Sequence, residues 1–92
     1  MLDRNLAQAH ANIGIAKLFL GRDRETQAHV EQALRLSPRD TFVYVWSLFI
    51  GQAKLWQGAD AEAIVWLRRS LEANQNYPIG HFYLAATVGR SP

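Results

Sequence analysis

Few side chains of this sequence have the type and spacing that chemistry requires. His10 and His81 could act as a metal-binding or acid–base pair, and Glu25 and His29 would share one face of a helix because they are four residues apart. Two ligands without a third acid or histidine make a poor metal site, since protein-bound zinc normally has three or four protein ligands. We therefore interpret these residues as structural.

Catalytic arrangements are missing from the sequence as well. It contains no cysteine, no glycine-rich phosphate loop, no paired general acid and base, and no nucleophile with a placed base. The adjacent Arg68 and Arg69 lie close in sequence to Glu62 and Glu72, which is typical of a solvated helix face. The sequence predicts a protein that is not an enzyme and that uses no metal or other cofactor.

Composition limits the partners and the compartment. The formal charge is +2, and the ten Lys and Arg residues are scattered from Arg4 to Arg90, so they form no stripe that could follow a phosphate backbone. No apolar run reaches the ~20 residues that cross a bilayer, and residues 1–10 lack the features of a signal peptide. We expect a cytoplasmic protein that binds neither nucleic acid nor a membrane.

An internal repeat organises the chain. Residues 13–21 read IGIAKLFLG, and 37 residues later residues 50–58 read IGQAKLWQG, with six of nine positions identical. The same shift over residues 7–40 and 44–77 gives nine identities in 34 positions, where chance would give about two. A third, partial copy begins at Pro78 with a shift of 34 residues. The repeat therefore predicts stacked units of one supersecondary structure.

Each unit is predicted to be a pair of α-helices. In the first unit, apolar residues recur at helical spacings from Leu6 to Leu20, Gly21 ends the helix, and Asp23 can cap a second helix that stops before Pro38. The later boundaries follow the same rules: Asp40 as N-cap of a helix to about Gln57, Gly58 and Asp60 at the next turn, and Pro78 at the start of a fifth helix to about Val88.

The expected fold is all-α, an α–α superhelix of about two and a half helix-turn-helix repeats with five helices in one domain. Its parts are repeat 1 at about 7–40, repeat 2 at about 41–77 and partial repeat 3 at about 78–90. Three extra residues between Pro38 and Tyr44 are expected to lengthen the third helix at its start. The stretch FVYVWSLFI, residues 42–50, would then be a buried helix, although its residue types favour a strand.

The repeat resembles the tetratricopeptide repeat, a 34-residue helix-turn-helix unit. The matching residues are Gly14, Gly21, Ala33 and Pro38 in the first unit and Gly51, Gly58 and Ala63 in the second, while Lys17, Thr26, Lys54 and Gln75 depart from the pattern. The segments LRLSPRD and LRRSLEANQNYPIGHFYLAA are also similar to repeat regions of bacterial adenylate cyclase-like or winged-helix multidomain signalling proteins. This resemblance implies a bacterial scaffold that binds proteins and carries no cyclase chemistry.

In such repeats the first helix of each pair lines the concave face of the solenoid. The predicted groove is apolar and aromatic with a few amides, and consists of Asn12, Ile15, Phe19, Val45, Leu48, Phe49, Gln52, Trp56, Phe82 and Tyr83. Trp46 and Trp66 are expected in the core. Such a groove suits an amphipathic helix or an apolar peptide, which aromatic side chains would hold by desolvation.

Three functions stay open from the sequence. The leading one is a non-enzymatic module that binds a peptide or protein segment in the aromatic groove. The second is self-association into a homodimer through exposed terminal helices. Ile79 and Phe82 lie on a last helix with no predicted partner, which implies either a continuation in a longer protein or burial in an oligomer. The third is RNA binding by a pentatricopeptide-like repeat, which the apolar Val45 and Phe49 disfavour.

Overall fold

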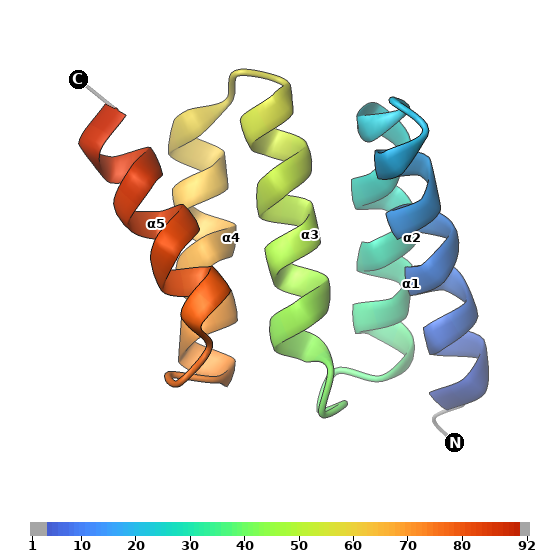
Figure 1. Ribbon diagram of the computed structural model, residues 1–92. Helices are drawn as coiled ribbons and strands as arrows, with labels where there is room; N and C mark the ends of the chain where they lie inside the picture. The colour runs from blue at the N-terminus through green and yellow to red at the C-terminus, as the bar shows by residue number, and fades with distance from the viewer. Residues whose placement is uncertain (1–3, 91–92) are drawn as a thin grey trace.

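Five α-helices follow one another in the computed structural model, which describes residues 4–90 (Figure 1). They are α1 (Arg4–Phe19), α2 (Asp23–Leu36), α3 (Val43–Trp56), α4 (Asp60–Ala73) and α5 (Pro78–Arg90). The described part of the chain contains no strand. The all-α prediction is therefore confirmed, including the helical state of the stretch FVYVWSLFI from residue 43 onward.

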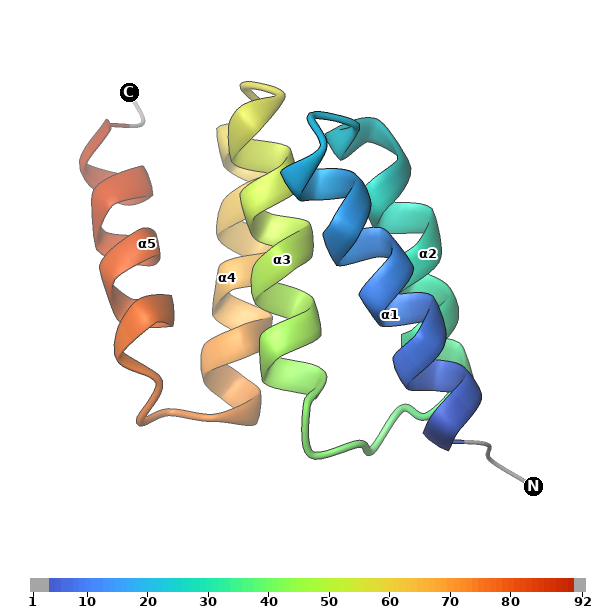
Figure 2. The ribbon, with the colours of Figure 1, turned by 45° about the vertical axis from the view of Figure 1, so that its right-hand side comes forward.

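The helices lie in two layers. Figures 1 and 2 show α1, α3 and α5 in one layer and α2 and α4 in the other, with α1 and α5 at opposite ends of the row. α1 packs against α2 and α3 against α4, and the pairs are joined through contacts of α2 with α3 and of α4 with α5. The result is an elongated stack of helical hairpins, 43 × 28 × 16 Å in extent.

A glycine in the left-handed conformation closes the turn inside each pair. Gly21 has φ 79° and Gly58 has φ 77°, values that residues with a side chain rarely adopt. Beyond Gly21, the N–H of Arg22 donates to the carbonyl of Lys17 at 2.8 Å, and the bond 37 residues later is 2.9 Å long. These are the hydrogen bonds of the Schellman motif, and they explain why the glycines recur in the repeat.

A second glycine in each unit allows the paired helices to approach closely. A Cβ atom added to Gly14 would lie 2.7 Å from Val30 Cγ2 and 2.9 Å from the Thr26 carbonyl oxygen. A Cβ atom added to Gly51 would lie 3.0 Å from Leu67 Cδ2. A side chain at Gly14 would therefore push the two helices apart, because the Thr26 carbonyl oxygen belongs to the backbone, whereas at Gly51 the end of the Leu67 side chain would have to shift by a few tenths of an ångström.

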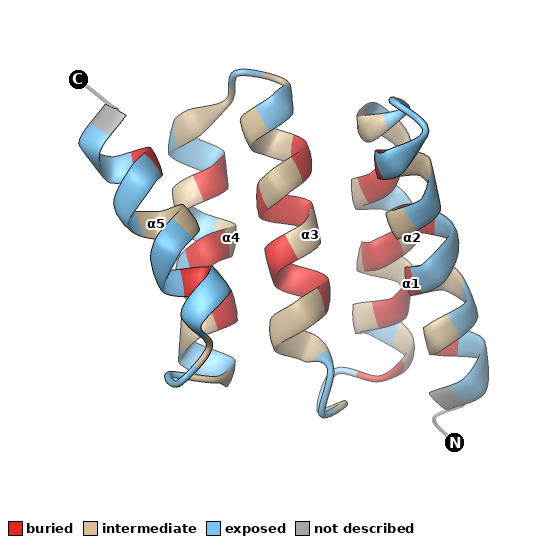
Figure 3. Ribbon diagram, in the orientation of Figure 1, coloured by how far each residue is buried: buried red, intermediate tan, exposed pale blue. Residues whose placement is uncertain are grey.

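The core lies where the first pair meets α3. Its buried residues are Ala7, Ala11, Val30, Ala33, Trp46 and Ile50. Trp46 is 4% exposed, as the sequence predicted, and Trp66 packs partly buried against the same cluster. α3 contacts α1, α2 and α4, which explains why it is apolar around its circumference and why Figure 3 colours it mainly buried or intermediate.

The predicted start of α3 is wrong. Asp40 does not cap this helix, which begins at Val43. Instead the Asp40 carboxylate holds the connecting loop, because Oδ1 accepts the Phe42 N–H at 2.9 Å and Oδ2 accepts the Ser37 hydroxyl at 3.2 Å. The three extra residues therefore belong to the loop over residues 37–42, and α3 has 14 residues like α2 and α4.

The predicted caps of the second helices are also shifted. Asp23 and Asp60 are the first residues of α2 and α4, and the preceding Arg22 and Ala59 make no side-chain capping hydrogen bond. Acidic residues in a first turn stabilise a helix through its macrodipole without capping it. The two aspartates thus mark the helix starts correctly and lie in the first turn, where their charge is favourable.

Candidate binding surface

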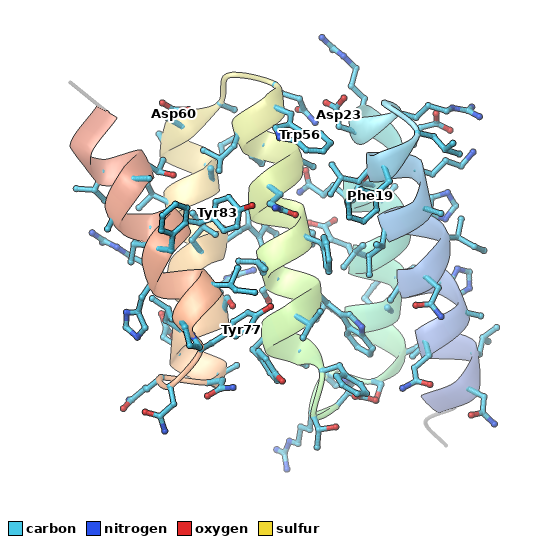
Figure 4. The ribbon with its side chains drawn as sticks, in the orientation of Figure 1. Phe19, Asp23, Trp56, Asp60, Tyr77 and Tyr83 are labelled. Carbon is cyan, nitrogen blue, oxygen red and sulfur yellow. The ribbon has the colours of Figure 1, made fainter. Side chains whose placement is uncertain are left out.

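The predicted groove residues all belong to α1, α3 and α5, the layer that the repeat register assigns to them. We call the surface of this layer the α1–α3–α5 face; Figure 4 labels Phe19 and Trp56 on it and shows Tyr83 reaching from α5 toward α3. The exposed fractions are 69% for Phe19, 56% for Trp56 and 69% for Phe82. Asn12 is also exposed, and the partly buried members are Ile15, Val45, Phe49, Gln52 and Tyr83.

Leu48 is the exception among these residues. Its side chain is only 3% exposed, so it cannot contact a ligand, and its prediction as a groove residue is wrong. Leu48 lies one helical turn before Gly51, which is in close contact with Leu67 of α4. It therefore shares the face of α3 that packs against the paired helix.

Aromatic rings join α1 to α3. The rings of Phe19 and Phe49 meet edge to face, with centroids 6.1 Å apart and planes at 73°. This arrangement is favourable for aromatic pairs, and it joins the end of α1 to the middle of α3. Since Phe19 stays 69% exposed, most of its ring is still available to a partner.

A cavity of about 290 Å³ opens between α1 and the start of α3. Its lining combines the predicted Asn12, Ile15 and Val45 with three further residues, Gln8, Phe42 and Trp46. Phe42 lies outside the predicted groove because the repeat register does not extend to the loop before α3. The lining is apolar with two amides, and the described residues that form it carry no formal charge.

A second cavity of about 310 Å³ lies between α3 and α5. It is lined by the predicted Trp56, Phe82 and Tyr83 together with Leu55, Ala86 and Thr87. The Gln52 amide donates to the Tyr83 hydroxyl at 2.7 Å, and Thr87 donates to the Tyr83 carbonyl at 2.7 Å. The bond from Gln52 holds the Tyr83 ring at the seam, so the cavity has a defined aromatic wall.

The opposite side of the molecule carries a hollow that the sequence did not predict. Its volume is about 420 Å³, and it is lined by Leu34, Pro38, Val43, Ser47, Trp66, Arg69, Glu72 and Ala73. The guanidinium of Arg69 lies 4.6 Å from the centre of the Trp66 ring. Arg69 is therefore held by a cation–π contact on α4, although it is exposed as expected.

The residues considered for metal or acid–base chemistry are kept apart. His10 lies on α1 and His81 on α5, at opposite ends of the helix row (Figure 1). The His81 Nε2 atom is 2.6 Å from the Gln75 carbonyl oxygen, so this imidazole has a hydrogen-bond partner in the backbone. Among the described residues, no group of three or more His, Asp and Glu side chains could hold a metal ion.

Glu25 is engaged in ion pairs and not with His29. Its carboxylate accepts a hydrogen bond from Arg22 Nη2 at 3.0 Å and lies 3.4 Å from Lys17 Nζ. The hydrogen bond from Arg22 is the main reason that the pKa of Glu25 is lowered from its ordinary value of 4.5. This carboxylate therefore serves the contact between α1 and α2.

None of the helices in residues 4–90 is long and apolar enough to cross a membrane. A scan against protein-family models finds no match to this chain, and a search of curated proteins also finds no match. The geometry of the α1–α3–α5 face is therefore the basis for the functional proposal.

Proposed function

We propose that this chain is a non-enzymatic protein-interaction module of the tetratricopeptide-repeat type. It binds a peptide or protein segment across the α1–α3–α5 face. The observation that carries the proposal is the exposure of Phe19 and Trp56 on this one face, at 69% and 56%. Large apolar side chains that stay exposed together favour association, because a partner that covers them removes apolar surface from water.

The two cavities of this face supply places for anchor side chains. One lies at the α1–α3 seam and the other at the α3–α5 seam, with the Phe19–Phe49 contact on the same layer. A segment that crosses the three helices would place one apolar side chain in each cavity. Buried aromatic and aliphatic anchors of this kind supply most of the affinity of protein interfaces.

The polar groups of the face favour an uncharged contact. The residues lining the two cavities include no Asp, Glu, Lys or Arg among those described, while Gln8 and Asn12 offer amide donors and acceptors. We therefore expect binding that changes little between low and high salt, in contrast to binding of a phosphate backbone. This is the reason that a peptide is preferred over RNA as the partner.

Selection of peptides from an unbiased display library, followed by titration with each selected peptide, tests the proposal. We expect Trp56→Ala and Ile15→Ala each to weaken binding about ten-fold or more. Val65→Ala is the matched control, because Val65 is 54% exposed but lies on α4. Equal losses for all three variants, or failure to select any peptide, would contradict the proposal.

The cellular setting of the module is proposed from its resemblance to the repeat regions of bacterial multidomain signalling proteins. The module would act in the cytoplasm as part of a larger bacterial signalling protein, and its partner would be another protein segment. RNA binding would contradict the proposal, and a filter-binding assay with mixed RNA oligonucleotides at two salt concentrations tests it. Salt-sensitive retention of RNA would replace the peptide proposal.

A further inference from the structure

Within residues 4–90, no helix covers one face of α5. The repeat places four residues of each first helix at corresponding positions: Ala7, Ala11, Gly14 and Leu18 in α1, Tyr44, Leu48, Gly51 and Leu55 in α3, and Pro78, Phe82, Ala85 and Gly89 in α5. The four in α1 are buried, those in α3 are buried or partly buried, and those in α5 are all exposed. Figure 3 accordingly colours much of α5 as exposed.

In the two complete pairs this face packs against a neighbouring helix. Gly14 is in close contact with α2 through Val30, and Gly51 with α4 through Leu67. α5 is anchored to α4 by its other side, where a Cβ atom on the buried Gly80 would lie 2.9 Å from Leu71 Cδ2. The free side of α5 thus corresponds to the side of α1 that packs against α2 and to the side of α3 that packs against α4.

The shape of the free side is self-complementary. Phe82 is a large protruding side chain, 69% exposed, and it is followed on the same stripe by the small residues Ala85, Ala86 and Gly89, all exposed. A Cβ atom added to Gly89 would meet nothing within 4 Å, so the surface there is open. The projecting ring of one such helix can therefore rest on the small residues of another.

The charge of α5 suits contact between identical helices. Residues 78–89 include no Asp, Glu, Lys or Arg, whereas α2 and α4 carry acids and bases along their length. Near the two-fold axis of a symmetric dimer each residue meets its own counterpart, so charged residues there would repel one another. The uncharged α5 face has no such penalty, which points to a second copy as its occupant.

We propose that two copies of this chain form a symmetric dimer through antiparallel contact of their α5 helices. Phe82 of each copy packs on Ala85, Ala86 and Gly89 of the other. The inference goes beyond peptide binding and does not depend on it, although Phe82 and Ala86 also line the α3–α5 cavity.

Disulfide trapping tests this arrangement directly, because the chain contains no cysteine of its own. In a symmetric dimer Ala85 lies near the axis, and the Cα atoms of a bridged pair need to be about 4.4–6.8 Å apart. Ala85→Cys should therefore form a covalent dimer under mild oxidation. Ala28→Cys, at an exposed position on α2, is the control that should stay uncrosslinked.

Light scattering after size-exclusion chromatography provides the second test. We expect the unmodified chain to be a dimer, and Phe82→Glu to raise the dissociation constant about 30-fold or more while leaving the helical content unchanged. Val65→Glu, equally drastic but on α4, should leave the dimer intact. A monomer at all concentrations, or a dimer that survives Phe82→Glu, would overturn the proposal.

Crosslinking also distinguishes the symmetric dimer from head-to-tail association. α1 has exposed apolar residues of its own, and a contact of α5 with α1 of the next copy would give an open chain of molecules. Such a chain would give mixed disulfides between Ala85→Cys and Ala16→Cys and no covalent dimer from Ala85→Cys alone. That result would refute the symmetric contact even if the protein associates.

Discussion

The Nζ atom of Lys54 lies 3.1 Å from Oε2 of Glu62 and links α3 to α4. The same bridge, 37 residues earlier, joins Lys17 to Glu25 across 3.4 Å. The backbone carbonyl of each lysine accepts the Schellman hydrogen bond, and its side chain makes the ion pair. Both interactions therefore recur at one position of the repeat. Lys17 and Lys54, which depart from the tetratricopeptide pattern, are thus explained by a contact that both units share.

Removing the Lys54–Glu62 bridge should cost little stability. The Glu62 side chain is 64% exposed, and exposed pairs contribute about 0.2–1 kcal/mol because water and salt screen them. A double-mutant cycle with Lys54→Met and Glu62→Gln, measured by urea denaturation, should give a coupling free energy of that size. A coupling that does not shrink in 1 M salt would contradict this view of the bridge.

Gly14→Ala should destabilise the fold more than Gly51→Ala. At Gly14 the new Cβ atom meets the Thr26 backbone oxygen at 2.9 Å, which cannot move alone, and we expect a loss of about 1–3 kcal/mol. At Gly51 it meets the mobile end of Leu67, and the better helix propensity of alanine, about 1 kcal/mol, offsets the contact. Equal melting temperatures for the two variants would show that the contact at Gly14 relaxes freely.

Thr26→Val should stabilise the protein. The Thr26 hydroxyl is fully buried, and its oxygen has no hydrogen-bond partner among the described residues. Replacing it by a methyl group removes a desolvated polar atom at constant shape, which we expect to add about 1 kcal/mol to the unfolding free energy. Thr26→Ser is the control that keeps the hydroxyl, and it should be less stable than the parent. The second unit has Ala63 at this position, which agrees with an apolar preference.

Stability should fall at alkaline pH through Tyr77. Burial raises the pKa of its phenol above the ordinary value of 10.0, and the neighbouring Tyr44, with ring centroids 4.8 Å apart, raises it further. Because the folded state holds this proton more tightly, the contribution is complete below pH 10 and is lost as the pH rises through the raised pKa. Tyr77→Phe should flatten the decline of unfolding free energy above pH 10, measured by urea denaturation at several pH values. A decline of unchanged slope would assign the effect to other groups.

The internal repeat was sufficient to predict much of the architecture. Residue types and spacing were enough to predict the helix pairs, the turn glycines Gly21 and Gly58, and the close-approach glycines Gly14 and Gly51. These features are local or pairwise within one unit, so their signal is contained in a short stretch of sequence. For the same reason the repeat register assigned Phe19, Trp56 and Tyr83 to one layer of helices.

The tertiary structure decided whatever depends on contacts between distant elements. Asp40 suited an N-cap by its type, but its bonds to Ser37 and Phe42 hold a loop instead, and no local rule separates the two uses. Leu48 and Phe82 occupy the same position of the repeat, yet one is 3% and the other 69% exposed. The residue type and the spacing are alike at both positions. Exposure differs because α4 covers α3, whereas no described helix covers that side of α5.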